Sequence, residues 1–292
     1  MSAASARTTV YRDFDQSELD RQYNSRGTVS DYTIYTRLYA ERTREAKHAL
    51  ACVENLHYGD GADETLDFYP ATTPGAPLQV FLHGGDWRAL SKDDSGFAAP
   101  AFVAAGAAFV AVNFSLVPAT TVAGMGAQVR RALTWLWRNA AAHGGDPDRL
   151  FVSGHSSGAN LVSQLLTTDW ARAFGAPADL IQGAAFMSGL GDLDPVRLSF
   201  RNANLKLDQA MVAETSLLRR KPGVHCPLIV AFGEGETDDY KRQCREVAAY
   251  WAAHGNAVEV FELKHRNHFD AVLEWADPQS ALFRANRAMM GL

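Results

Sequence analysis

The chain alternates between short apolar runs and longer stretches in which apolar residues recur at helical spacing. Short apolar runs without alternation are typical of strands that are buried on both faces of a sheet. Such runs predict strands at residues 78–82, 107–114, 150–152, 183–188 and 228–232. Residues 58–69 alternate loosely, as an early strand would, and the alternation of residues 257–263 indicates a strand nearer an edge.

The segments between these strands predict helices. Residues 122–143 show the pattern best, because Val129, Leu133 and Leu136 fall on one side of the helix. The other helices are predicted at residues 31–50, 98–105, from 157 onward, 238–254 and in the final residues of the chain. Strands that alternate with helices in this way predict an α/β fold, in which helices cover both faces of a mainly parallel sheet.

Two segments depart from this alternation. Residues 1–27 are polar and aperiodic and predict an arm, so that residues 1–50 consist of an arm and a helix. Residues 191–227 are irregular and mixed in polarity, which indicates a cap-like excursion over the top of the sheet. No change in composition marks a boundary, and we therefore expect residues 1–292 to form a single domain.

The helix predicted at residues 31–50 carries an aromatic stripe. The residues that recur at helical spacing are Tyr32, Tyr35, Leu38, Tyr39 and Arg42. A stripe of this kind is more often packing than function, so we expect it to face the body of the protein.

Composition narrows the class of protein. Hydrophobic residues make up 47% of the 292 residues and charged residues 21%, and the net charge of −5 argues against nucleic acid as a partner. The three cysteines lack metal-ligand spacing and indicate free thiols in a reducing compartment. The N-terminus lacks the apolar core of a signal peptide, and the most apolar stretch, residues 98–112, is short for a membrane span. We therefore expect a cytoplasmic protein that binds neither nucleic acid nor membranes.

The strongest chemical signal is G-x-S-x-G at residues 154–158, between the strand at 150–152 and a helix. A serine on such a turn adopts a strained backbone conformation that exposes its hydroxyl at the top of the sheet. Gly154 and Gly158 leave room for the strand and the helix to approach each other. Ser156 is therefore the candidate nucleophile.

A serine hydroxyl is a weak nucleophile and needs a base within hydrogen-bond reach. His268 is the best candidate, because it follows the last predicted strand, and loops after parallel strands share one edge of the sheet with the nucleophile turn. His265, in the same loop, is the rival. The two form H-x-x-H without an apparent third ligand, which disfavours a metal site.

The acid that orients the histidine is expected in the loop after the preceding strand. The carboxylates of that loop are Glu234, Glu236, Asp238 and Asp239, and spacing alone leaves the choice open. Asp238 and Asp239 also suit the acidic first turn of the next helix. The order nucleophile, acid and histidine is that of the α/β-hydrolase fold.

The oxyanion of an acyl-transfer reaction needs backbone N–H donors. His83-Gly84-Gly85 follows a central predicted strand, and glycine lets the backbone approach a substrate closely. One donor is expected from Gly84 or Gly85 and the other from Ser157, at the start of the helix that follows the nucleophile. Asp86 and Trp87, which come next in the chain, are candidate substrate-binding residues.

Longer motifs resemble the arylformamidase (kynurenine formamidase-like) branch of the α/β-hydrolases, which is close to the hormone-sensitive-lipase-like esterases. The motifs are YNxR from Tyr23, Tyr58-Gly59 with Leu66-Asp67, HGGDWRALSKDD from His83, NFSLVP from Asn113, GGDPDRL from Gly144, GHSSGA from Gly154, SGLGDLDP from Ser188, GEGETDDYKRQ from Gly233 and RNHFD from Arg266. They cover most of the chain.

The resemblance implies that Ser156 is the nucleophile, His268 the base and Glu236 the acid, although aspartate is common at the acid position in similar enzymes. Ala159 stands where glycine is usual but is small enough for close helix packing. Asp86 is the sharper departure, because the family usually has an aromatic residue there. Either Asp86 turns outward or pairs with a cation such as Arg88, or it binds a cationic part of the substrate.

These observations predict a serine hydrolase that needs no metal or other cofactor and cleaves small carboxylic esters or (aryl)formamides and amides through an acyl-enzyme. One alternative is a general carboxylesterase without a physiological formamide substrate. Another is a catalytically silent hydrolase fold that binds a ligand, although such a protein is expected to lack a triad member. The sequence leaves the oligomeric state open, a homo-oligomer included.

Overall fold

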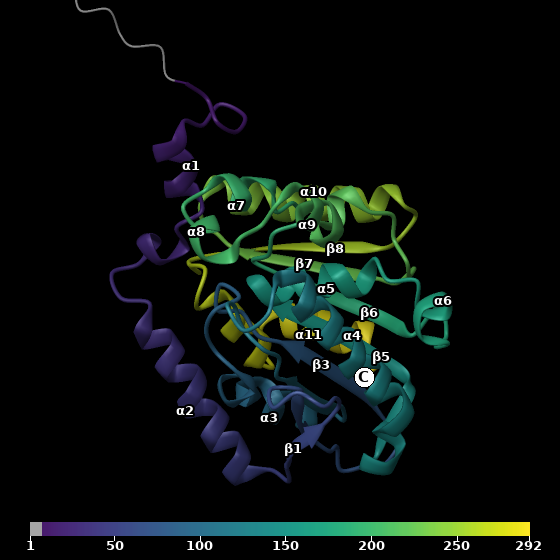
Figure 1. Ribbon diagram of the computed structural model, residues 1–292. Helices are drawn as coiled ribbons and strands as arrows, with labels where there is room; N and C mark the ends of the chain where they lie inside the picture. Colours follow the sequence, from purple (N-terminus) through teal and green to yellow (C-terminus); the bar gives the residue numbers. More distant parts are fainter. Residues whose placement is uncertain (1–7) are drawn as a thin grey trace, which may run out of the picture.

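An eight-stranded sheet runs through the described part of the chain (Figure 1). The computed structural model describes residues 8–292, so residues 1–7 of the predicted arm lie outside the described part. The strand order is β1-β2-β4-β3-β5-β6-β7-β8. Pairs β1–β2 and β2–β4 are antiparallel and the other neighbours are parallel, which confirms the predicted mainly parallel sheet. The strands are β1 Val53–His57, β2 Thr65–Tyr69, β3 Ala76–Leu82, β4 Ala108–Val112, β5 Gly145–His155, β6 Ile181–Met187, β7 Leu228–Gly233 and β8 Val258–Leu263.

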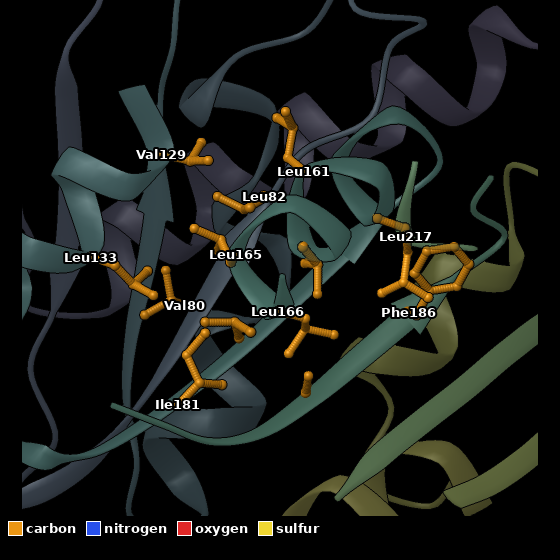
Figure 2. Close-up of a cluster of buried hydrophobic side chains, with 14 of the residues drawn as sticks. Val80, Leu82, Val129, Leu133, Leu161, Leu165, Leu166, Ile181, Phe186 and Leu217 are labelled. Carbon is orange, nitrogen blue, oxygen red and sulfur yellow. The ribbon is translucent and has the colours of Figure 1, made fainter. Parts of the chain in front are cut away.

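Helices cover both faces of the sheet, as the alternation predicts. Strand side chains point alternately to the two faces, so neighbours such as Val80 and Phe81 of β3 belong to different apolar clusters. The cluster of Val80 includes side chains of α4 Val122–Asn139, α5 Ser157–Leu166 and α10 Asp238–Ala253. Figure 2 shows part of this cluster, with Val80, Leu133 and Leu165 among the labelled side chains.

The opposite face carries the cluster of Phe81. Side chains of α2 Thr33–Ala49, α3 Ala99–Ala104 and α11 Ala281–Met289 pack there. The remaining helices are α1 Gln16–Gln22, α6 Trp170–Phe174, α7 Asp194–Leu198, α8 Asn202–Leu205 and α9 Gln209–Thr215. None of the helices in residues 8–292 is long and apolar enough to cross a membrane.

The segment predicted as a polar, aperiodic arm is ordered and partly helical in its described part. Helix α1 begins after Asp15, whose carboxylate accepts a hydrogen bond from the Glu18 amide, and a 3₁₀ turn follows at Ser25–Thr28. Both pieces are too short to show a periodic pattern in the sequence. Leu19 and Tyr23 are nevertheless fully buried.

The excursion at residues 191–227 is also more regular than its sequence indicates. It contains the short helices α7, α8 and α9. Local signals start two of them, because Pro195 lies in the first turn of α7 and the Asp208 carboxylate accepts the Met211 amide of α9. These helices have one or two turns, which is too little for hydrophobic periodicity to reveal.

The strand predicted at residues 58–69 is shorter in the structure and begins later. Its ladder begins at Thr65, and an unpredicted edge strand, β1, precedes it. Asn55 of β1 has φ 58° and the register shifts there, so the strand lacks the regular alternation that marks a strand in the sequence. At the other edge, the exposed side chains of β8 agree with the edge position predicted for residues 257–263.

Candidate active site

Ser156 lies at the turn between β5 and α5, the point at which the sequence predicts a strained serine. Its φ and ψ are 56° and −120°, a conformation that residues with a side chain rarely adopt. Close packing leaves no room for side chains beside it: a Cβ on Gly154 would lie 2.4 Å from the Gly158 carbonyl oxygen, and one on Gly158 would lie 2.1 Å from that of Leu82. The glycines therefore allow the helix to start directly against β3 and β5.

His268, in the loop after β8, contacts both predicted partners. Its Nε2 lies 3.0 Å from the Ser156 hydroxyl oxygen and its Nδ1 lies 2.8 Å from Glu236 Oε2. A carboxylate accepts hydrogen bonds, so Nδ1–H donates to Glu236 and Nε2 is left to accept from the serine hydroxyl. This is the tautomer that a general base requires.

Glu236, in the loop after β7, is fully enclosed and accepts several hydrogen bonds. Its Oε1 accepts from the Ser188 hydroxyl at 2.6 Å and from the Gly233 amide at 2.8 Å. Burial acts to raise the pKa of Glu236, but the neighbouring His268 and these hydrogen bonds outweigh it and lower that pKa below its ordinary value. The carboxylate is therefore ionised and can stabilise an imidazolium.

The rival residues lie elsewhere. His265 is 94% exposed, and Glu234 pairs with Lys264 and accepts from the His265 amide. Asp238 is exposed in the first turn of α10, as expected of a helix N-terminus. Asp239 is buried but is bound by Arg242 and the Tyr23 hydroxyl. Of these carboxylates, only Glu236 contacts His268.

The loop predicted to form the oxyanion hole packs against Ser156. A Cβ on Gly84 would lie 3.2 Å from Ser156 Cβ and 2.9 Å from the His155 carbonyl oxygen, so the Gly84 backbone lies directly beside the serine. Gly85 has φ 105°, which favours glycine. The hydrogen bonds of residues 8–292 include none donated by the amides of Gly84, Gly85 or Ser157. These amides are free to bind an oxyanion.

Two buried histidines beside the site are neutral. Burial, reinforced by the nearby His268, lowers the pKa of His155 to about 3, and burial lowers the pKa of His83 to about 4. His155 Nε2–H donates to the His268 carbonyl oxygen at 2.8 Å, and thereby ties the histidine loop to the nucleophile turn. His83 Nδ1–H donates to the Gly84 carbonyl oxygen at 2.8 Å.

A cavity opens at Ser156 and His268. Its volume is about 110 Å³. Much of its wall is aromatic and comes from the N-terminal segment, the histidine loop and the excursion. Besides His155 and His268, the ring-bearing and charged lining residues are Tyr23, Arg26, Tyr32, Tyr39, Asp86, Arg88, Phe200, Arg201 and Phe269.

The sequence did not reveal several of these residues. The spacing of the aromatic stripe predicts packing alone. Tyr39 does pack in the apolar cluster and Tyr32 stacks on Phe269, but both also line the cavity. Their helical spacing predicts the correct face of α2. It does not indicate that part of this face borders the active-site cavity. Tyr23 and Arg201 lie in segments predicted to be an arm and an irregular excursion, and offered no local signal beyond the YNxR motif.

Asp86 is held between two arginines. Its Oδ2 lies 3.1 Å from Arg88 Nη2, and its Oδ1 lies 2.8 Å from Nη2 of the buried Arg201, an ion pair without hydrogen-bond geometry. Arg201 also donates to the Tyr240 hydroxyl at 2.7 Å. This placement agrees with the expectation that Asp86 pairs with a cation, and adds Arg201 to the predicted partner Arg88.

Trp87 does not lie where a substrate-binding residue was expected. Its side chain is buried in the apolar core and does not line the cavity, while the Arg201 guanidinium lies 5.8 Å from its ring. Trp87 has φ 57° directly after Asp86 with φ 60°, and these two left-handed residues turn the indole inward. The Trp87 expectation therefore has no support from the structure.

A second group of carboxylates lies away from this site. Glu54, Asp67 and Asp93 are close enough to share a cation. The Lys47 ammonium lies 2.7, 2.7 and 2.8 Å from them, and Lys92 lies 3.0 Å from Asp67. Lysine side chains therefore neutralise this cluster.

Comparison with known proteins extends over nearly the whole chain. Residues 66–179 match the family model described as BD-FAE. The chain is 30% identical to the kynurenine formamidase of Salmo salar over 96% of its own length and 98% of that protein. A candidate thioesterase from Silicibacter sp. TM1040 superposes with a TM-score of 0.80 at 24% identity, covering 94% of this chain and 99% of that one. Esterase LipW from Mycobacterium marinum superposes with a TM-score of 0.69 at 20% identity, covering 96% and 90%.

Proposed function

The chain belongs to the kynurenine formamidase family of α/β-hydrolases, and on that premise we propose that it cleaves small aryl formamides through an acyl-enzyme on Ser156. Hydrolysis of esters or formamides is the chemistry of this family and of its structural neighbours. The observation that carries the residue assignment is the continuous set of contacts from Glu236 through His268 to Ser156.

In the proposed first step, His268 Nε2 takes the proton of the Ser156 hydroxyl while its oxygen attacks the substrate carbonyl carbon. The negative charge that develops on the carbonyl oxygen is stabilised by amides of Gly84 or Gly85 and Ser157. His268 then gives the proton to the leaving nitrogen, the C–N bond breaks, and the acyl group remains on Ser156. His268 then takes a proton from a water molecule, which attacks that ester. The bond between the acyl carbon and the Ser156 oxygen breaks, His268 returns the proton to Ser156, and the acid is released.

Glu236 has an electrostatic role in this scheme. Each proton transfer places a positive charge on the imidazole, and an ionised carboxylate 2.8 Å from Nδ1 stabilises that charge. Its hydrogen bonds to Ser188 and Gly233 hold the carboxylate in place, so little reorganisation is needed when the charge appears.

The cavity supports an aromatic leaving group. Rings of Tyr32, Tyr39 and Phe269 line it, and such rings favour stacked or edge-on contact with another aromatic ring. Asp86 is paired with two arginines, which favours a structural role for its charge over recognition of a substrate ammonium. The small volume of the cavity favours a small molecule as substrate.

The free cysteines support a cytoplasmic location.

The substrate class can be tested by comparing kcat/KM for N-formylkynurenine, a simple aryl formamide, and short and medium nitrophenyl esters. The proposal expects turnover of both formamides, with the aryl formamides preferred to the medium-chain ester. Good ester hydrolysis with inert formamides would indicate a general carboxylesterase instead. A protein that turns over none of them and is not labelled by a fluorophosphonate probe would be a ligand-binding hydrolase fold.

The nucleophile is tested by Ser156→Ala. The variant is expected to stay folded and to lose about 10³-fold or more in kcat, because the serine, histidine and acid act as a unit. Ser153→Ala and Ser157→Ala should be far milder, since neither side chain contacts His268 and both variants keep their amides. Turnover close to that of the wild type in Ser156→Ala would refute the mechanism.

A further inference from the structure

The N-terminal segment from Asp15 to Tyr39 reaches the two loops that carry Glu236 and His268. Figure 1 shows α1 and α2 along one side of the molecule, with α1 near the α7–α8 region. The segment also lines the cavity, through Tyr23, Tyr32 and Tyr39 among others. Its contacts with the two loops are specific hydrogen bonds as well as apolar packing.

The first set of contacts fixes the residues directly after Glu236. The Thr237 hydroxyl donates to the Gln22 carbonyl oxygen at 2.7 Å, and the Asp239 amide donates to Gln22 Oε1 at 3.0 Å. The Tyr23 hydroxyl donates to the Asp239 carboxylate and accepts from Gln243 Nε2 at 2.7 Å. Tyr23 is fully buried, so water cannot take over these bonds.

The second set fixes the residues on both sides of His268. The Tyr39 hydroxyl donates to the Phe269 carbonyl oxygen, and Asn267 Nδ2 donates to the Tyr35 hydroxyl at 2.9 Å. The Phe269 ring stacks on Tyr35 at 5.9 Å and on Tyr32 at 5.7 Å between centroids. Tyr39 is 3% exposed, so its bond to Phe269 is also closed to water.

The contact between Glu236 and His268 therefore depends on the positions of two loops, and the N-terminal segment binds both of these loops. Glu236 and His268 lie on different loops, and the distance between their polar atoms is 2.8 Å. A misplacement of about 1 Å in such a group can cost about 100-fold in rate. Removing a buried hydroxyl also leaves its partner unsatisfied, so the loop would move to find another one.

We propose that Tyr23 and Tyr39 are positioning residues, which hold the acid loop and the histidine loop in the register that aligns Glu236, His268 and Ser156. The proposal rests on the proposed function in assigning catalysis to these three residues. It gives the N-terminal segment a part in forming the reactive geometry, beyond walling the cavity.

Tyr23→Phe and Tyr39→Phe test it, because both keep the ring and remove only the hydroxyl. Tyr58→Phe is a matched control: the Tyr58 hydroxyl donates to the Asn113 carbonyl oxygen at 2.6 Å, and Tyr58 is also buried but does not line the cavity. Each test variant is expected to lose about 10-fold or more in kcat with a smaller change in KM, whereas Tyr58→Phe stays near the wild type.

The pH profile separates positioning from a general loss of structure. When the Glu236–His268 contact loosens, the imidazolium is less stabilised, so the acidic limb of kcat/KM should move to lower pH in both test variants. In the Tyr23→Phe/Tyr39→Phe double variant, the fold-loss in kcat should be smaller than the product of the two single losses, because both tyrosines act through the same Glu236–His268 contact.

Two results would overturn the proposal while leaving the proposed function intact. One is wild-type kcat and an unmoved acidic limb in both test variants, with Ser156→Ala inactive. The other is an equal loss in all three tyrosine variants without a shift of the acidic limb. A wild-type protein that a fluorophosphonate fails to label at Ser156 would instead refute the proposed function, and this proposal with it.

Discussion

Glu236 shows how a buried carboxylate is kept ionised. Its neighbours in the chain, Glu234 and Asp238, are carboxylates of similar local sequence, but they face solvent or surface cations. Glu236 faces His268, a hydroxyl and an amide, which all donate hydrogen bonds to it. The three carboxylates therefore differ in the direction in which the turn points them, and only Glu236 points towards His268 and can take part in catalysis.

Glu236→Gln is expected to lower kcat by about 10³-fold or more with little loss of folded protein. The amide oxygen can still accept from Ser188 and Gly233, so the amide nitrogen would face His268 Nδ1 and favour the tautomer with the proton on Nε2. That tautomer cannot accept the Ser156 proton. The measurement is kcat for the best formamide or ester substrate.

The matched controls for this prediction are Glu234→Gln and Asp238→Asn. Both change one exposed carboxylate to its amide, and both should stay close to the wild type in kcat. Greater damage in either control than in Glu236→Gln would mean that the acid has been assigned to the wrong residue.

Asp86 brings a negative charge to the cavity wall. The buried Arg201 depends on that charge, because the Tyr240 hydroxyl, to which its guanidinium donates a hydrogen bond, is neutral. Burial acts to lower the pKa of Arg201, but Tyr240 and Asp86 outweigh it and hold that pKa above its ordinary value. Substituting either Asp86 or Arg201 alone is therefore expected to destabilise the protein, because the partner's charge would be left unpaired.

Asp86→Asn is expected to lower the free energy of unfolding by about 1–3 kcal/mol, since it leaves the Arg201 charge poorly compensated. Urea unfolding measures this change, and Arg88→Gln, which alters the more exposed partner, should lower stability less. The kcat/KM values for a neutral ester and for an ammonium-bearing substrate should change in parallel. A selective loss for the ammonium-bearing substrate would assign Asp86 to substrate recognition instead.

At the scale of elements, the sequence predicts best what is determined locally. The strands β3, β4 and β7 appear as apolar runs because both of their faces are buried. The turn around Ser156 is a local motif of strand, glycine and helix, and the structure places it as predicted. Elements of one or two turns, such as α1 and α8, owe their order to tertiary contacts and could not be found from periodicity.

The same distinction applies to the candidate site. Ser156 and the glycine loop follow from local patterns, and His268 follows from its place after the last strand. Spacing left the acid open among several carboxylates, and only the resemblance selected Glu236. Arg201 could not be predicted, because its role depends on Asp86, which is far from it in the chain.

Aromatic stripes show a further limit of pattern. The spacing of Tyr35 and Tyr39 gives the face of α2 that meets the body, and both residues do pack there. Spacing does not tell what lies opposite, which here is the loop of His268. A tyrosine hydroxyl at such a contact can form a hydrogen bond, which a hydrophobic pattern in the sequence does not predict.

At the scale of the whole molecule, the buried neutral histidines make stability depend on pH. His83 and His155 have pKa values of about 4 and about 3 in the folded protein, against about 6.5 for an unfolded chain. The unfolded state therefore takes up protons first as the pH falls. The stabilisation is complete above about pH 6.5 and is lost as the pH falls towards 4. The lowered pKa of Glu236 acts in the same direction, but only below about pH 4.5.

The free energy of unfolding should thus fall by about 2 kcal/mol for each of these histidines between pH 7 and pH 5. Urea unfolding at a series of pH values measures the fall. His83→Asn removes one of the two groups while its amide can still donate to the Gly84 carbonyl oxygen, so this variant should lose about 2 kcal/mol less than the wild type over that range. His265→Asn is the control, because His265 is almost fully exposed, and its curve should run parallel to that of the wild type. If the His83→Asn curve also ran parallel to the wild type, His83 would not be the source of the acid sensitivity.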